Sequence, residues 1–548
     1  MYNGGHVTKK GGTEIVEKSF IKGATILGLA GLICKILGAI YRIPYQNITG
    51  NEGMYVYQQV YPLFSTLIIL ATAGFPLAIS KLVSERVAVG DEVGAKQVYN
   101  VSSIGLLITG VFFFSVLYFG APWFAQWMGN EEMLTLPIET VSFALLIIPV
   151  MAAARGYFQG YQDMMPTAVS QVIEQFVRVC TILLLSYLMI TLGYGPVYAG
   201  AGAVFGSFTG AVAGFIVLLV YMRKKRIERA TNVSAEKKPY TKGKRKVLKE
   251  VFLIAFPICL GSLVLPLYQL VDSFTVANIL EQAKGEAFAI AQKGIYDRGQ
   301  PLIQFASFFA SAISLSLVPS IADLRARGET RKAENRARLA LRVTWMLGLP
   351  ASIGLFIIAE PVNVMLFEDS AGSSALAILA FSAFFSTLGI TSVGILQGFG
   401  KLYLPVLFLF LGSIVKIGLN YSLIPTIGIE GAAWASVLAY AFSTYLTLRA
   451  CLQQFTGKMS NKGAQIRSGV LTIFLLVVST KGVLEILRWG FGEAQGRVSM
   501  TFISLVTVII GIFVYIFALF RFHLIPDEDL EQLPKLQSIV HKFRWLRR

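Results

Sequence analysis

The sequence is dominated by apolar stretches of about 20 residues or more, which recur along almost the whole chain and are separated by short polar loops. A stretch of this length crosses the hydrocarbon core of a bilayer as an α-helix. The stretches are continuous and do not alternate between apolar and polar residues, so a transmembrane β-barrel is excluded. We therefore predict an all-α polytopic membrane protein with about 14 transmembrane helices. They are placed near residues 22–42, 55–80, 98–120, 135–155, 167–190, 197–221, 251–278, 296–320, 339–359, 374–396, 404–424, 430–450, 469–488 and 499–520.

The composition supports one helical bundle rather than several globular domains. Hydrophobic residues make up 55% of the 548 residues and charged residues 14%, with a mean hydropathy of +0.64. A soluble domain carries about 25% charged residues, so this chain has too few charges to cover a surface that faces water.

The formal net charge of +17 comes mainly from lysines and arginines in alternate loops, which is typical of a membrane protein and not of a nucleic-acid-binding one. We expect no nucleic-acid partner. The basic loops are 81–97, 222–250, 321–338 and 449–467, whereas 121–134, 191–196, 360–373 and 422–429 contain no lysine or arginine. This asymmetry predicts a multi-pass protein of the bacterial cytoplasmic membrane with both termini in the cytoplasm. No cleavable signal peptide is expected, because the first apolar stretch is long and contains Lys35.

One set of motifs occurs twice, in the same order. The first set consists of Gln159-Gly160-Tyr161, Pro166, Arg178 and Gly195, and the second of Gln397-Gly398-Phe399, Pro405, Lys416 and Gly428. We predict two parallel six-helix repeats, 1–221 and 251–450, joined by the linker 222–250. Residues 451–548 supply two extra helices and a cytoplasmic tail. The basic linker either sets the topology or binds anionic lipids.

Several ionisable residues lie inside predicted helices, where each costs about 2.5–3.5 kcal/mol and needs a partner, water or a function. Lys35 and Arg42 lie two turns apart in the first helix, and Asp297 and Arg298 open the eighth. A cluster of uncompensated cations that faces a central cavity would suit a pyrophosphate, through charge-assisted and bidentate contacts. Alternatively, Lys35 and Arg42 extend to opposite membrane interfaces.

Other polar residues have competing interpretations. Gln58 and Gln59 either donate hydrogen bonds into a cavity or bridge helices. Glu174 and Arg178 are four residues apart, so we interpret them as a structural pair within one helix. Asp272 is a candidate for coupling transport to an ion.

The sequence contains no motif for catalysis or for a bound cofactor. The three histidines, His6, His523 and His541, lie in the polar tails, and no nucleotide-binding glycine-rich motif occurs. The four cysteines have no paired or metal-ligand spacing, and we interpret them as small core residues. We expect no enzyme activity, no cofactor and no metal site.

The chain resembles the multidrug/oligosaccharidyl-lipid/polysaccharide exporter superfamily over essentially its whole length. It is most similar to the lipid II flippases of the MurJ/MviN type and to the polysaccharide exporters that include stage V sporulation protein B. The matching motifs are Lys35-Ile36-Leu37-Gly38, Tyr296-Asp297-Arg298, Leu317-Val318-Pro319-Ser320, Leu349-Pro350-Ala351-Ser352 and Phe367. The resemblance implies alternating access and pyrophosphate ligands at Lys35 and Arg298, with Arg42 matching less closely.

The expected function is translocation of an undecaprenyl-pyrophosphate-linked saccharide, driven by membrane potential or an ion gradient without ATP. The expected partners are this lipid-linked glycan, the bilayer and cell-wall synthesis proteins. The chain lacks the flippases' basic residues between Arg42 and Lys81 and their carboxylate one turn after Arg298. The cargo therefore stays open among lipid II and teichoic, capsular or spore-cortex precursors. Two alternatives are a cation-coupled multidrug exporter, with Asp272 as its coupling residue, and a non-transporting scaffold for cell-wall assembly.

Overall fold

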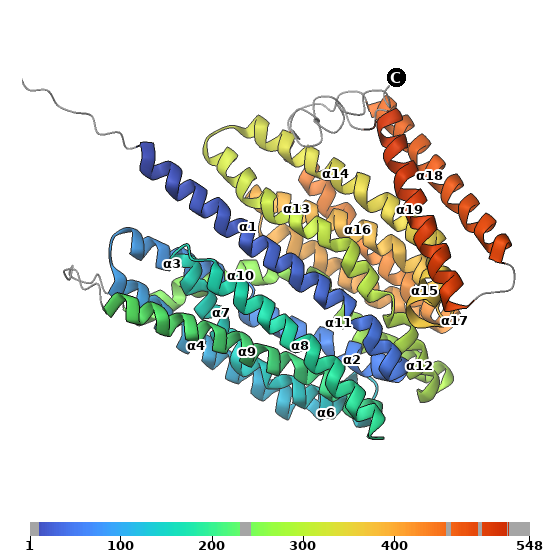
Figure 1. Ribbon diagram of the computed structural model, residues 1–548, viewed down its shortest axis with the longest axis horizontal. Coiled ribbons are helices and arrows are strands. Elements are labelled where there is room, and N and C mark those ends of the chain that lie inside the picture. The colour runs from blue at the N-terminus through green and yellow to red at the C-terminus, as the bar shows by residue number, and fades with distance from the viewer. Residues whose placement is uncertain (1–9, 231–242, 456–461, 492–495, 523, 525–548) are drawn as a thin grey trace, which may run out of the picture. The chain divides into compact units, whose positions relative to one another are not determined.

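A computed structural model describes residues 10–230, 243–455, 462–491, 496–522 and 524, and every regular element in these ranges is an α-helix (Figure 1). The chain forms two compact units, Met1–Ser273 and Phe274–Arg548. The prediction of an all-α chain is confirmed.

The first unit contains helices α1 to α10 and the beginning of α11. Their bounds are α1 Lys10–Ile40, α2 Arg42–Thr72, α3 Phe75–Ala88, α4 Glu92–Phe119, α5 Ala121–Trp127, α6 Glu131–Ser142, α7 Ala144–Gly160, α8 Met165–Thr191, α9 Pro196–Ala230, α10 Lys244–Ser262 and α11 Val264–Lys284. Helices α8 and α9 pack together along their length, and α1 lies against α8 (Figure 1).

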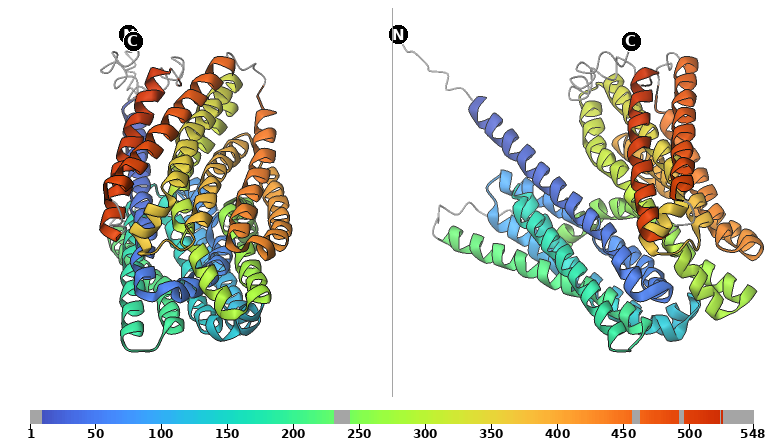
Figure 2. Two further views of the ribbon diagram at one scale, coloured as in Figure 1. Left: turned by 90° about the vertical axis from the view of Figure 1, so that its right-hand side faces the viewer. Right: turned by 45° about the vertical axis from the view of Figure 1, so that its right-hand side comes forward.

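The second unit contains the end of α11 and the remaining helices. Their bounds are α12 Glu286–Asp297, α13 Gln300–Ala326, α14 Thr330–Ile357, α15 Ala359–Phe367, α16 Ser373–Gly398, α17 Tyr403–Leu452, α18 Lys462–Phe491 and α19 Arg497–Arg521. Helices α13, α14 and α16 pack against one another. Helices α18 and α19 run side by side, and Figure 2 shows this pair in red and orange.

Ten helices or helix runs among the described residues are long and apolar enough to cross a membrane. Two of them exceed a single crossing: Thr25–Ala88 has 64 residues and Tyr403–Leu452 has 50. The bent pair Lys244–Ser262 and Pro266–Lys284 adds an eleventh candidate. Each of the predicted spans lies on helices of this set or on α12 and α13, so the chain is a polytopic membrane protein.

Several predicted spans are interrupted where the sequence introduces a break. The predicted span 55–80 is divided into α2 and α3 beside Gly74, where a Cβ would lie 2.2 Å from the carbonyl oxygen of Ala255 in α10. Only glycine allows this approach, and Pro76 then fits the first turn of α3. The predicted spans 404–424 and 430–450 are the two helical segments of α17, and the non-helical residues Ile427 and Gly428 separate them.

The predicted repeat appears in the packing inside each unit. Helices α4 and α14 each have 28 residues. They are preceded by glycines in the left-handed region, Gly90 (φ +75°) and Gly328 (φ +77°). Helices α3, α4 and α7 pack together in the first unit as α13, α14 and α16 do in the second.

The closest helix contacts of the repeat also correspond. Gly160 of α7 lies against Val83, and Gly398 of α16 lies against Ile321. The same distance along the sequence separates each residue from its counterpart: Gly160 from Gly398, Val83 from Ile321, Gly90 from Gly328, and Arg178 from Lys416. This constant register is consistent with the predicted repeat.

Large apolar side chains are exposed on the outer faces of the membrane-length helices, for example Leu184, Ile216, Phe474 and Phe513. In water such a surface would be a liability, whereas in a bilayer it contacts lipid. Exposed Trp123, Trp127, Tyr194, Tyr198 and Trp489 lie near helix ends, as expected of residues at a membrane–water interface.

The cysteines are only partly core residues. Cys259 and Cys451 are buried in apolar clusters, and Cys34 is half-buried. Cys180 is exposed on α8, so its interpretation as a core residue is wrong. Its helix presents an apolar face to lipid at this point, where a small thiol needs no packing partner.

Candidate functional site

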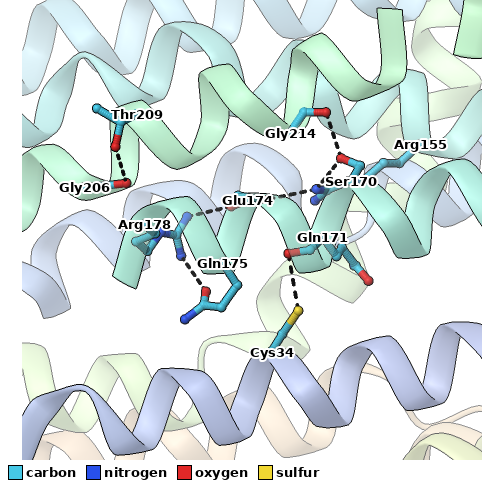
Figure 3. A network of polar contacts seen from close by, with 10 residues as sticks. All are labelled: Cys34, Arg155, Ser170, Gln171, Glu174, Gln175, Arg178, Gly206, Thr209 and Gly214. Atoms are coloured by element: carbon cyan, nitrogen blue, oxygen red, sulfur yellow. Dashed lines mark hydrogen bonds and ion pairs between the residues drawn. The ribbon is translucent and has the colours of Figure 1, made fainter. Parts of the chain in front are cut away.

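In the first unit, the carboxylate of Glu174 is shared by two arginines (Figure 3). Arg155 Nη2 lies 2.7 Å from Oε2, and Arg178 Nη2 lies 2.6 Å from Oε1. Arg178 is one turn along α8 from Glu174, as predicted, whereas Arg155 comes from α7. The predicted pair is therefore part of a triad, and its side chains are only 12–18% exposed.

A row of glycines on α9 allows this helix to lie close to α8, which carries two residues of the triad. A Cβ at Gly206, Gly210 or Gly214 would lie 2.6–3.1 Å from a carbonyl oxygen of α8, those of Arg178, Glu174 and Ser170 respectively. Small residues at this spacing allow two membrane helices to approach closely. Ser170 completes the arrangement, because its hydroxyl accepts from Arg155 Nη2 (2.9 Å) and donates to the carbonyl of Gly214 (3.0 Å).

The triad carries a net positive charge, because two guanidinium groups share one carboxylate. Helix α1 lies beside it, held by the thiol of Cys34, which donates to the carbonyl oxygen of Gln171 at 3.3 Å (Figure 3). A charged group in a membrane helix normally lies in the protein interior and has a specific partner. Here the partner neutralises only one of the two cations.

Arg42, at the start of α2, is 3% exposed and is surrounded by tyrosines. Its guanidinium lies 5.4 Å from the ring centroid of Tyr61 and interacts electrostatically with Tyr41 and Tyr57. Its Nε and Nη1 atoms have no hydrogen-bond acceptor among the described residues. Arg178 interacts electrostatically with the same three tyrosines, so Arg42 and the triad belong to one cationic cluster.

A break in α2 creates the tyrosine environment. In a straight helix, Tyr45 and Tyr57 would be about 18 Å apart along the axis. Their ring centroids are 5.2 Å apart, because the chain turns at Gly50, which has φ +68° and ψ −164°. Gln46 Nε2 donates to Asn51 Oδ1 across the turn at 2.8 Å, and the hydroxyl of Tyr45 donates to the carbonyl of Gly53 at 2.7 Å.

Lys35 and the glutamines differ from Arg42 in their surroundings. Lys35 is exposed on α1. Gln58 is buried. Gln59 is buried as well, and its Nε2 donates to the carbonyls of Met128 (2.8 Å) and Ser273 (2.7 Å). Gln59 therefore bridges helices, which is one of its two predicted roles; the other was a hydrogen bond into a cavity.

In the second unit, two ion pairs surround the junction between α12 and α13. Lys293 Nζ contacts both carboxylate oxygens of Asp297, at 2.7 and 2.6 Å, and both side chains are almost completely buried. Arg298 Nη1 and Nη2 donate to the two oxygens of Asp369, at 2.6 and 2.9 Å. The guanidinium also lies 5.3 Å from the ring centroid of Phe367.

These contacts correct one expectation. Arg298 was predicted to be an uncompensated cation, but Asp369, which is distant in sequence, compensates it. Asp297 is the counter-ion of Lys293 and lies one turn from it on α12. The loop between α15 and α16 thus supplies a carboxylate to Arg298. The assignment of Arg298 and Asp297 to substrate binding stays a prediction.

The remaining predicted residue, Asp272, is buried in α11, and its role in ion coupling stays a prediction. Among the described residues, no group of three or more His, Cys, Asp or Glu side chains is arranged to hold a metal ion.

Sequence reasoning missed Arg155, Lys293 and Asp369. The sequence could have indicated Arg155 and Lys293. Each is a cation in or next to a predicted membrane helix, where a charge needs a partner. Lys293 lies four residues before Asp297, a spacing that predicts an ion pair. Asp369 had no local signal, because its partner is 71 residues away.

The apolar helices and the buried ionic clusters define a polytopic membrane protein of the transporter type. The chain belongs to the polysaccharide biosynthesis protein family, whose family model matches residues 20–325. A second family model, MatE, matches residues 257–422.

Relatives from Bacillus subtilis align over nearly the whole chain. An uncharacterized membrane protein, YabM, is 36% identical, with 94% of each chain covered. Lipid II flippase MurJ is 28% identical, covering 92% of this chain and 96% of the relative. Stage V sporulation protein B is 26% identical, covering 96% and 100%. The named activities among these relatives are those of a transporter and not of an enzyme.

Solved structures show the same fold. Lipid II flippase MurJ in an inward closed conformation aligns with a TM-score of 0.64 and 15% identity, over 90% of this chain and 98% of that one. An inward-facing multidrug resistance MATE family transporter of the MOP superfamily aligns with a TM-score of 0.59 and 18% identity, over 77% and 94%. The chain is thus a multi-pass protein of the bacterial membrane with the MOP superfamily fold.

Proposed function

We propose that this protein translocates an undecaprenyl-pyrophosphate-linked saccharide across the cytoplasmic membrane by alternating access, with both termini in the cytoplasm. The observation that carries the proposal is the excess of buried cations in the first unit. Arg155 and Arg178 share the single carboxylate of Glu174, and the buried Arg42 lies against the ring of Tyr61. A pyrophosphate supplies the negative charge that this cluster lacks.

The chemistry of arginine favours a phosphate-containing cargo. A guanidinium is always charged, is planar, and forms two parallel hydrogen bonds to phosphate oxygens. Arg42 has two buried nitrogen atoms without an acceptor among the described residues, and a buried unsatisfied donor costs about 1–3 kcal/mol. An anionic head group that accepts hydrogen bonds from these atoms would remove this destabilisation. The free energy gained would favour binding of the head group. Similarity to a lipid II flippase over more than nine-tenths of both chains is consistent with this cargo.

A cation-coupled multidrug exporter is the second candidate. It is supported by the MatE match, which includes the buried Asp272. A multidrug exporter for cationic drugs would need an acidic site, whereas the first unit concentrates arginines. We therefore rank this function second.

The test is translocation of a fluorescent undecaprenyl-pyrophosphate saccharide in proteoliposomes. The wild type is compared with Arg42→Ala, Arg298→Ala and the control Arg327→Ala. Arg327 pairs with Asp323 on the exposed surface, and such pairs contribute little. We expect translocation by the wild type and the control, and a loss of at least about tenfold for the two other variants, corresponding to about 1.4 kcal/mol.

Correctly inserted wild-type protein that moves no lipid-linked saccharide but exports a cationic dye would contradict the proposal and support multidrug export. Absence of both activities would favour a scaffold role in cell-wall assembly.

A further inference from the structure

The loop between α15 and α16 places one carboxylate on Arg298. The loop follows Phe367 and begins with Glu368 in the left-handed region (φ +71°). The next residue, Asp369, accepts from both terminal nitrogens of Arg298, and its Oδ1 also accepts from the backbone N–H of Ala371 at 2.8 Å. The contact is a bidentate carboxylate–guanidinium pair.

The two partners differ in exposure. The side chain of Arg298 is 4% exposed, whereas that of Asp369 is 47% exposed. If Asp369 moved away from Arg298, little new carboxylate surface would become exposed to solvent. The buried guanidinium, however, would lose this anion. A buried cation that loses its partner is strongly destabilised. An anion that takes the place of Asp369 on Arg298 would avoid this cost.

Neighbouring carboxylates are not available to replace it. Asp297 is next to Arg298 in sequence, but both of its oxygens contact Lys293. Glu368 is next to Asp369, but it contacts Arg497 at the start of α19. Of these three carboxylates, Asp369 is therefore the one that pairs with Arg298, and it is half-exposed.

Asp369 is ionised at neutral pH. Burial alone would raise the pKa of its carboxyl group, but the hydrogen bonds and positive charge of Arg298 and the N–H of Ala371 outweigh this effect and lower the pKa below 3.8. The carboxylate therefore competes with other anions for Arg298 throughout the physiological pH range.

We propose that Asp369 is a resident counter-ion of Arg298 that a phosphate group of the cargo must displace, so that it determines the selectivity of this site for phosphate over weaker anions. A guanidinium binds carboxylate and phosphate through the same bidentate geometry. A cargo that presents two adjacent phosphates can exchange with Asp369, whereas a neutral or monoanionic head group competes poorly. The inference rests on the proposed function, because it concerns Arg298 as a cargo ligand.

The loop is anchored so that Asp369 can move while α15 stays in place. Arg497 contacts Glu368 and donates through Nε to the carbonyl of Met365 (3.1 Å), and Arg488 of α18 pairs with Glu360 (2.8 Å). The two C-terminal helices thus hold both ends of α15. On the other side, Asn363 Nδ2 donates to the carbonyl of Ala371 at 2.7 Å. Rotation of the Asp369 side chain can therefore break its contact with Arg298 while the anchored α15 stays in place.

The test is calorimetric binding of inorganic pyrophosphate to the purified full-length protein. The wild type is compared with Asp369→Asn, Asp369→Ser, Glu368→Gln and Arg298→Ala. Asparagine and serine remove the charge but can still accept from Ala371. We expect the two Asp369 variants to bind pyrophosphate about 3- to 10-fold more tightly than the wild type, because the competing anion is gone. Glu368→Gln changes net charge equally at the adjacent residue and should alter Kd less than about twofold, while Arg298→Ala should lose binding.

Equal or weaker pyrophosphate binding by both folded Asp369 variants would overturn the inference and reduce Asp369 to a residue that orders the loop. Equal tightening by Glu368→Gln would also overturn it, since the effect would then be long-range charge. The translocation assay is separate. Tighter binding in the Asp369 variants without lipid translocation by the wild type would retain the counter-ion and reject the proposed function.

Discussion

At the scale of the residue, Glu174 balances two arginines in a helix pair that we assign to the bilayer. Glu174→Gln would leave Arg155 and Arg178, which are largely buried, without their shared negative charge. Removing one partner of a buried pair costs about 3–5 kcal/mol. We expect a clearly lower unfolding temperature in detergent. The control is Glu329→Gln, whose partner Lys332 is 72% exposed, and which should cost at most about 1 kcal/mol.

The outcome for Glu174 also separates two roles of the triad. If Glu174→Gln is as stable as the wild type, the arginines are held by hydration or by Ser170 rather than by the carboxylate. The triad would then be weakly coupled to folding.

The sequence predicted the residue pairs that local spacing determines. The pairing of Glu174 with Arg178 follows from one helical turn. The contact of Arg155 with Glu174 and that of Arg298 with Asp369 depend on which helices and loops become neighbours. Helical periodicity carries no information on that choice. Burial of a charge indicated that a partner was needed, but only the tertiary structure identified it.

At the scale of the element, α8 and α9 depend on the glycine row of α9. The Cβ of Gly210→Ala would lie 2.6 Å from the carbonyl oxygen of Glu174 and 3.0 Å from Arg178 Cβ. A backbone atom cannot move aside as the end of a flexible side chain can, so the helices must separate. We expect this to lower the free energy of unfolding by about 1–3 kcal/mol. A matched substitution, Gly418→Ala, meets no atom within 4 Å and should be neutral or stabilising by up to about 1 kcal/mol. Thermal unfolding of the two variants in detergent measures the difference.

A Gly210→Ala variant as stable as Gly418→Ala would mean that α8 and α9 tolerate a wider separation. The close approach would then not position the triad.

The existence and order of the helices were predictable because a bilayer demands long apolar stretches. The positions at which the helices are interrupted were harder to predict. The break between α6 and α7 at Phe143 occurs inside the predicted span 135–155, whereas the turn of α2 at Gly50 falls in the gap between two predicted spans. At Gly74, close approach of α10 requires a missing Cβ, which is a tertiary cause. Hydropathy averages over such single positions and cannot locate them.

At the scale of the whole molecule, the repeat shows how one helix arrangement acquired two chemistries. The first unit pairs Arg178 with Glu174, whereas the position that corresponds to Glu174 in the second unit is Gly412, near the buried Lys416. The second unit instead places its ion pairs at α12, α13 and the loop before α16. The packing of glycines and helix ends thus corresponds between the two units, while the charged residues differ. This divergence is expected if packing determines the fold and the charges determine the function.

The topology provides the last prediction. Helices α10 and α11 are bent by 57° at a short break, so together they form either one broken crossing or a re-entrant segment. Tyr194 lies in a loop predicted outside and Arg327 in a loop predicted inside, and both are exposed. Between them lie α9, the bent pair and the α12–α13 span. If the bent pair crosses, the number of crossings is odd and the two residues lie on opposite sides of the membrane.

The measurement is labelling of Tyr194→Cys and Arg327→Cys with a membrane-impermeant maleimide, in a background where Cys34, Cys180, Cys259 and Cys451 are alanine. We expect Tyr194→Cys to be labelled in intact cells and Arg327→Cys only after permeabilisation. Labelling of both in intact cells would make the bent pair re-entrant and would place the loop that carries Asp369 on the cytoplasmic side. The pair that Asp369 forms with Arg298 would then lie towards the side where the cargo is loaded and not towards the side where it is released.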